Sequence, residues 1–109
     1  MAARVAELEN ELLALELTAL RVVAHSADGE PHPASSVLKL KGTELQQAVT
    51  ELLVDLAGPA SLASGTDEGA LPDWVHRTVP TYLNYRKASI YGGSNEVQRQ
   101  IIARTILGL

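Results

Sequence analysis

The chain has 109 residues, enough for one small domain with a modest core and too few for separate nucleotide-binding and substrate domains. Its net charge of −4 argues against general nucleic-acid binding, and the absence of cysteine excludes disulfides and thiolate metal sites. No apolar run approaches the roughly 20 residues of a membrane helix, so we expect no membrane insertion. The N-terminus lacks the pattern of a secretory signal, and we expect a cytoplasmic protein.

The charges are distributed unevenly along the chain. Residues 1–73 contain 4 basic and 12 acidic side chains, whereas residues 74–109 contain 5 basic side chains and only one acidic side chain, Glu96. These charges fit the solvated faces of helices. They also fit a C-terminal third that meets an anionic partner.

The first segment has the period of an amphipathic helix and is followed by the turn-forming residues 28–33. One apolar stripe faces a neighbour, and a second stripe widens the apolar surface, which suits a helix packed against two neighbours in a bundle. The two stripes consist of Val5, Leu8, Leu12, Leu15, Ala19 and Val22, and of Leu13, Leu17, Leu20 and Ala24.

A second long helix is predicted over residues 35–57 from its apolar spacing. Ser35 or Ser36 is suited to cap its start, and Gly58-Pro59 is a strong stop signal. Residues 58–72 are rich in Gly, Pro and Ser, and we interpret them as a long internal loop.

A third, shorter helix is expected to begin near Asp73 or Thr78, with Pro80 in its first turn, and to continue to Ile90. After the break at Gly92-Gly93, Ser94 or Asn95 can cap a last helix. Its expected apolar face consists of Val97, Ile101, Ile102 and Ile106. Since no strand pattern occurs, we predict a single domain over 1–109, an all-α antiparallel bundle of about four helices, two long and two shorter.

Two constellations give weak chemical signals. Ser36 and Lys39 have the Ser-x-x-Lys spacing of some serine nucleophiles, but the partner motifs are missing, so a helix start with a surface lysine is the better interpretation. His25, His32 and His76 lack metal-ligand spacing, and we predict no metal site.

The segment from Tyr91 to Arg99 combines a helix end, a double-glycine turn and a new helix start. Such a turn allows backbone N–H groups to approach a ligand closely, and the positive end of the helix dipole favours negative charge there. Gly-Gly-Ser turns are common between helices, so this signal alone is weak.

The whole stretch Ile90-Tyr-Gly-Gly-Ser-Asn-Glu-Val-Gln-Arg99, continuing to Leu109, resembles the C-terminal signature of flavin-dependent acyl-CoA dehydrogenases. The start of the second helix at 34–39 and the segment 53–58 resemble the same family, and Arg86 matches its usual basic residue before the turn. The resemblance implies a helical domain of an oligomeric enzyme that oxidises acyl-CoA thioesters and passes electrons to an acceptor. The oligomer would be made of identical subunits or of two kinds of subunit.

The resemblance also implies roles for single residues. Gly93 and Ser94 match the turn positions beside FAD, and Glu96 occupies a place where a polar side chain commonly reaches FAD. In one branch of the family the catalytic carboxylate directly follows the tyrosine of the turn, and here that position is Gly92, which cannot abstract a proton. We therefore expect a C-terminal part of such an enzyme that contributes to the FAD site and the subunit interface and is inactive alone. The alternative is a non-catalytic helical interaction module that keeps the fold without flavin.

Overall fold

The computed structural model describes residues 1–26, 29–62 and 71–109. Within these ranges the chain forms helices and no strands, so the predicted all-α fold with two long and two shorter helices is confirmed. None of these helices is both long enough and apolar enough to cross a membrane. The elements are α1 (Ala2–His25), α2 (Ser35–Ala57), the 3-10 turn η1 (Pro59–Leu62), α3 (Asp73–Tyr85), the 3-10 turn η2 (Arg86–Ser89) and α4 (Asn95–Thr105).

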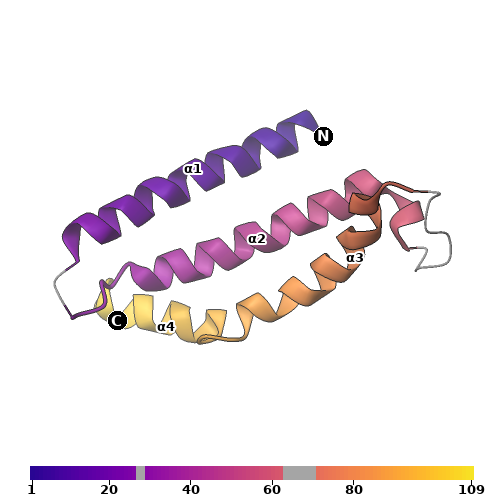
Figure 1. Ribbon diagram of the computed structural model, residues 1–109. Helices are drawn as coiled ribbons and strands as arrows, with labels where there is room; N and C mark the ends of the chain where they lie inside the picture. The colour runs from indigo at the N-terminus through magenta and orange to yellow at the C-terminus, as the bar shows by residue number, and fades with distance from the viewer. Residues whose placement is uncertain (27–28, 63–70) are drawn as a thin grey trace.

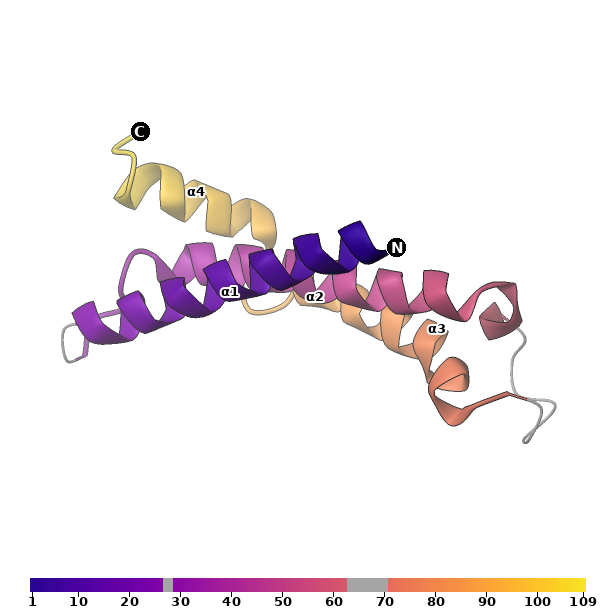
Figure 2. The same ribbon diagram turned by 90° about the horizontal axis from the view of Figure 1, so that it is seen from above.

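Helix α2 is the central element of the molecule. Helix α1 runs antiparallel along one side of α2, while α3 and α4 follow one another along another side (Figure 1). The molecule is elongated, with extents of 53 × 27 × 25 Å. Its radius of gyration is 17.5 Å, against about 13 Å for a compact domain of this length. In the view from above, α1 lies in front of α2, and α4 lies apart from α1 to one side (Figure 2).

The packing of α1 differs from the prediction of two neighbours. Among the described elements α1 packs on α2, and only Val22 of α1 is buried. The expected second stripe remains in solvent, with Leu13, Leu17 and Leu20 exposed by 55%, 54% and 65%. Within the described part of this chain α1 thus has one main neighbour and not two, because the width of an apolar face shows how much surface a helix can bury and not how many neighbours the same chain provides.

Ion pairs connect the helices at the surface. Arg4 of α1 pairs with Asp55 of α2, and the hydrogen bond that Arg4 donates to the Asp55 carboxylate raises the pKa of the guanidinium above its ordinary value. Glu44 of α2 accepts from Arg99 of α4 at 3.1 Å and lies 3.6 Å from Lys41. These side chains are exposed, so water and salt screen the pairs and each contributes little to stability.

The ends of α2 were predicted correctly, but its cap was not. The helix spans Ser35–Ala57 and ends at Gly58, whose φ is +71°. Neither Ser35 nor Ser36 caps the start, since Ala34 is the N-cap residue and makes no side-chain cap bond. Instead, the ring nitrogen Nδ1 of His32 accepts a hydrogen bond from the Ala34 N–H at 3.0 Å, which satisfies a donor just before the helix.

The third helix begins at Asp73, one of the two predicted positions, so Pro80 lies within α3 and not in its first turn. The helix ends at Tyr85, and the expected continuation to Ile90 is instead a 3-10 turn. At this helix end the Gln47 side-chain amide donates to the carbonyls of Tyr85 and Arg86, at 3.2 and 3.4 Å, and so supplies donors to carbonyls at the end of the helix. Of the predicted loop 58–72, η1 occupies four residues, and 63–70 lie outside the described residues.

Candidate functional site

The double-glycine turn connects η2 to α4. Both glycines have a left-handed backbone, with φ of +66° at Gly92 and +84° at Gly93. A Cβ atom at Gly93 would lie 2.6 Å from Nε2 of Gln98, whereas a Cβ atom at Gly92 would have no atom within 4 Å. Gln98 therefore closes the turn on the side of Gly93, and the side of Gly92 is open to an approaching group.

The start of α4 is capped by Ser94. Its hydroxyl oxygen accepts a hydrogen bond from the Val97 N–H at 3.3 Å, so the predicted cap at this position is confirmed for Ser94. Glu96 is exposed in the first turn of α4, where a carboxylate interacts favourably with the helix dipole. Gln98 donates to the Gly92 carbonyl at 3.4 Å and is itself buried.

A row of polar side chains on α2 contacts both sides of the turn. Lys39, Thr43 and Gln47 are spaced four residues apart, so they lie on one face of the helix. Lys39 Nζ donates to the Ala88 carbonyl at 2.9 Å and to Asn95 Oδ1 at 3.4 Å. The hydroxyl of Thr43 lies 3.2 Å from the same Asn95 oxygen. We call Lys39, Thr43 and Gln47 the polar row of α2.

Helix α4 packs on the polar row with a different face from the one expected. Asn95 and Gln98 are the buried residues of this helix, with Ile102 half-buried. Three residues of the predicted apolar face are exposed instead, Val97 by 46%, Ile101 by 37% and Ile106 by 46%. The physical reason is that the neighbouring surface of α2 presents hydrogen-bonding groups, which pair with Asn95 and not with isoleucine.

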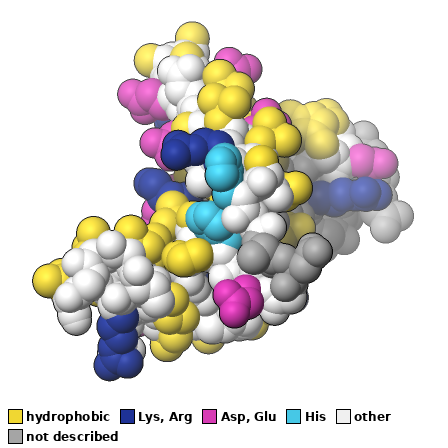
Figure 3. Space-filling view, turned by 90° about the vertical axis from the view of Figure 1, so that its left-hand side faces the viewer, with side chains coloured by type: hydrophobic (Ala, Val, Ile, Leu, Met, Phe, Trp, Pro, Cys, Tyr) yellow, Lys and Arg dark blue, Asp and Glu magenta, His cyan; other side chains and the backbone are white. Residues whose placement is uncertain are grey.

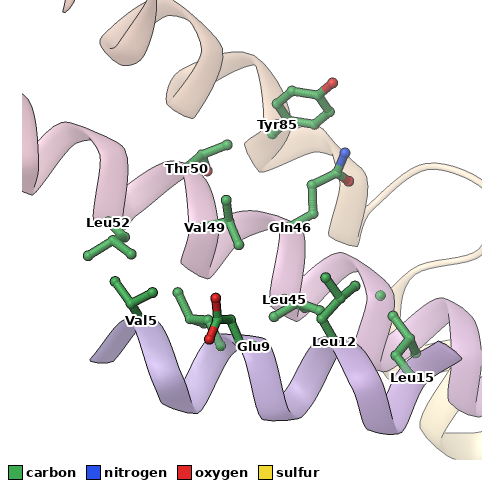
Figure 4. A pocket seen from close by; sticks show the side chains of 12 residues that line it. Val5, Glu9, Leu12, Leu15, Leu45, Gln46, Val49, Thr50, Leu52 and Tyr85 are labelled. Atoms are coloured by element: carbon green, nitrogen blue, oxygen red, sulfur yellow. The ribbon is translucent and has the colours of Figure 1, made fainter. Parts of the chain in front are cut away.

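Two hollows adjoin this part of the fold. The smaller, about 360 Å³, is lined by Lys39, Thr43, Tyr91 and Gly92 among others, so it reaches the open side of the turn. The larger, about 790 Å³, is a groove between α1 and α2 (Figure 4). In it Val5, Leu12 and Leu15 of α1 point toward Leu45, Val49 and Leu52 of α2, with Tyr85 at its upper side.

Of the other residues considered as chemical groups in the sequence, Ser36, Lys39 and His25 have contacts that indicate structural roles. Ser36 is buried, and the Lys39 ammonium is bonded to Ala88 and Asn95 and not to Ser36, which gives no support for a nucleophile. His25 Nδ1 lies 2.8 Å from the Arg21 carbonyl near the end of α1. In the described ranges no group of three or more His, Cys, Asp or Glu could hold a metal ion.

The predicted cofactor residues Gly93, Ser94 and Glu96 lie together at the start of α4, next to the open side of Gly92. Sequence reasoning missed the polar row and Asn95. Lys39 was interpreted as a surface residue, although it is half-buried. A signal was present in the sequence, because Lys39, Thr43 and Gln47 recur at a four-residue spacing and therefore share one face of α2.

Comparison with known proteins identifies the class to which this fold and turn belong. The chain belongs to the acyl-CoA dehydrogenase family and matches its C-terminal domain over residues 1–107. It is 37% identical over 82 residues to the acyl-CoA dehydrogenase IpdE1 of Mycolicibacterium smegmatis, an alignment that covers 75% of this chain and 19% of that protein. It is 36% identical over 74 residues to IpdE1 of Mycobacterium tuberculosis, covering 68% of this chain and 18% of that protein.

The chain thus spans about a fifth of the length of these curated relatives. No solved structure matches it significantly.

Proposed function

We propose that this chain supplies part of the FAD site and of the subunit interface of an acyl-CoA dehydrogenase. The whole enzyme would remove the α-proton and the β-hydride of an acyl-CoA thioester and pass the electrons to an acceptor. The observation that carries the proposal is the turn at Gly92-Gly93, which is open on one side and leads directly into a capped helix start.

The residues at the turn fit a nucleotide-containing cofactor. The space beside Gly92 allows a ligand to reach the backbone, and the Ser94 hydroxyl follows two residues later in the sequence. The positive end of the α4 dipole and the basic side chains of residues 74–109 favour a negatively charged group. When bound, FAD would accept the substrate hydride, while this chain's residues bind and orient it.

The proton acceptor of the reaction is not supplied by the turn. Gly92 has no side chain, so a carboxylate elsewhere in the enzyme would abstract the α-proton in this proposal. We therefore expect the isolated chain to show no turnover with an acyl-CoA, FAD and an artificial electron acceptor. Sustained turnover by the purified chain would contradict this assignment.

A titration of the ¹⁵N-labelled chain with FAD, followed by NMR, tests the proposed contact. We expect weak, saturable shifts of the backbone amides at 92–96 and none along α1. Ser94→Ala removes the hydroxyl at the turn and should reduce these shifts, whereas Ser89→Ala, in η2 before the turn, should leave them unchanged. The absence of any response at 92–96 up to millimolar FAD would refute the proposal.

The exposed apolar surface favours a second candidate, a non-catalytic module that binds other subunits without flavin. Large hydrophobic side chains are exposed on both α1 and α4, for example Leu20 by 65% and Val97 by 46%. This function predicts association without any response of the turn to FAD, so the same titration separates the two candidates.

A further inference from the structure

Lys39 contacts the chain on both sides of the glycine turn. Its ammonium donates to the carbonyl of Ala88, three residues before Tyr91, and to the side chain of Asn95, directly after Ser94. The two partners are separated from Lys39 by 49 and 56 residues in the sequence. One side chain therefore connects the element before the turn with the helix after it.

The Ala88 carbonyl depends on this contact. Ala88 is only 1% exposed, so its carbonyl has little access to water. The neighbouring backbone amides, of Ile90 and Tyr91, both donate to the Lys87 carbonyl at 2.9 and 3.1 Å and leave Ala88 without an amide donor among the described backbone bonds. A buried carbonyl requires a donor, and Lys39 supplies it.

A lysine is chemically suited to this place because its ammonium has three donors and no acceptor. Both of its partners, the Ala88 carbonyl and Asn95 Oδ1, are acceptors, so one group can satisfy both. The Thr43 hydroxyl contacts Asn95 and the Leu40 carbonyl of its own helix but not Ala88, and so cannot replace the connection to Ala88.

We propose that Lys39 is a positioning residue for the glycine turn. Its bonds set the distance between η2 and the start of α4. They thereby set the geometry in which the open side of Gly92 and the Ser94 hydroxyl meet a ligand. The ligand part of this inference rests on the proposed flavin contact. The conformational part rests on the hydrogen bonds alone.

Hydrogen exchange of the amides on the two sides of the turn tests the conformational part. The amide of Tyr91, bonded to Lys87, and that of Gln98, bonded to Ser94, report on η2 and α4. In Lys39→Met, which keeps the length of the side chain and removes its donors, we expect both amides to exchange about tenfold faster. Lys41→Met is the matched control, because Lys41 lies on the same helix and forms only exposed ion pairs, and it should change neither amide.

A second variant keeps the test decisive if Lys39→Met does not fold. Asn95→Ala removes the acceptor on the α4 side and leaves the bond from Lys39 to Ala88. It should accelerate exchange at Gln98 and leave Tyr91 unchanged. Equal exchange in Lys39→Met and Lys41→Met, or an equal acceleration at both amides in Asn95→Ala, would overturn the proposal.

The FAD titration tests the ligand part. In Lys39→Met the shifts at Gly93 and Ser94 should be lost at FAD concentrations that shift them in Lys41→Met, and Lys39→Arg should partly restore them because it keeps the charge and donors. If the native chain shows no FAD response, the proposed function fails while the exchange data still decide the role of Lys39. If Lys39→Met binds FAD as the native chain does, the positioning role is wrong and the proposed function stands.

Discussion

At the scale of single residues, the two glycines of the turn have different requirements. Both need a left-handed backbone, but only Gly93 faces a neighbouring atom, Nε2 of Gln98. The sequence predicts the turn from the Gly-Gly pair, since this pair commonly interrupts helices. The sequence does not predict which glycine lacks space for a side chain, because the Gln98 amide reaches the Gly92 carbonyl only after α4 has formed.

Alanine substitutions at three glycines should have three different effects on the free energy of unfolding, measured by urea denaturation. Gly93→Ala should lower it by about 1–2 kcal/mol, because the Gln98 side chain must also give up its bond to Gly92, which adds a small cost to the backbone strain. Gly92→Ala should lower it by about 1 kcal/mol, from strain alone.

Gly42→Ala should raise the free energy of unfolding by about 0.5–1 kcal/mol. The position is inside α2, and the added methyl would meet Leu15 Cδ2 at an ordinary 3.8 Å. Equal losses at positions 92 and 93 would show that Gln98 does not close the turn.

At the scale of the elements, periodicity predicts where helices form better than it predicts how they are oriented. The bounds of α2 follow from the leucine spacing and the Gly58-Pro59 stop, both of which are local signals. The buried face of α4 could not be predicted from its own sequence. It depends on Lys39 and Thr43, which lie more than fifty residues away on α2.

Two leucines of the paired long helices should respond differently to mutation. Leu52 of α2 is 7% exposed, so Leu52→Ala should lower the free energy of unfolding by about 2–4 kcal/mol. Leu17 of α1 is 54% exposed, and Leu17→Gln should change the stability of the monomer by less than about 0.5 kcal/mol. Thermal unfolding at low protein concentration measures both, and a large loss in Leu17→Gln would show that α1 has a second neighbour.

At the scale of the whole molecule, the chain exposes more surface than a self-contained domain of its mass. Its accessible surface is 7636 Å², whereas a folded monomer of 11.6 kDa exposes about 5,800 Å². The difference, about 1,800 Å², exceeds the roughly 800 Å² that each partner buries in a standard interface. Viewed from the end at which the C-terminus lies, hydrophobic side chains appear on the surface among the polar ones (Figure 3).

We expect the purified chain to self-associate, because its exposed hydrophobic side chains form stripes on α1 and α4. Light scattering over a concentration series should show dimers or larger species, and Leu13→Gln combined with Leu17→Gln should shift the series toward monomer. A clean monomer at every accessible concentration would contradict this expectation.

The central position of α2 also has a consequence for the order of folding. Helices α1 and α2 are consecutive in the sequence, so their pairing closes a short loop and can occur early. The bonds from Lys39 and Thr43 to Asn95 join residues 56 and 52 apart, and they require α2, η2 and α4 all to be in place. The geometry of the glycine turn is therefore completed late, and it is present only in chains that have folded through to the C-terminal helix.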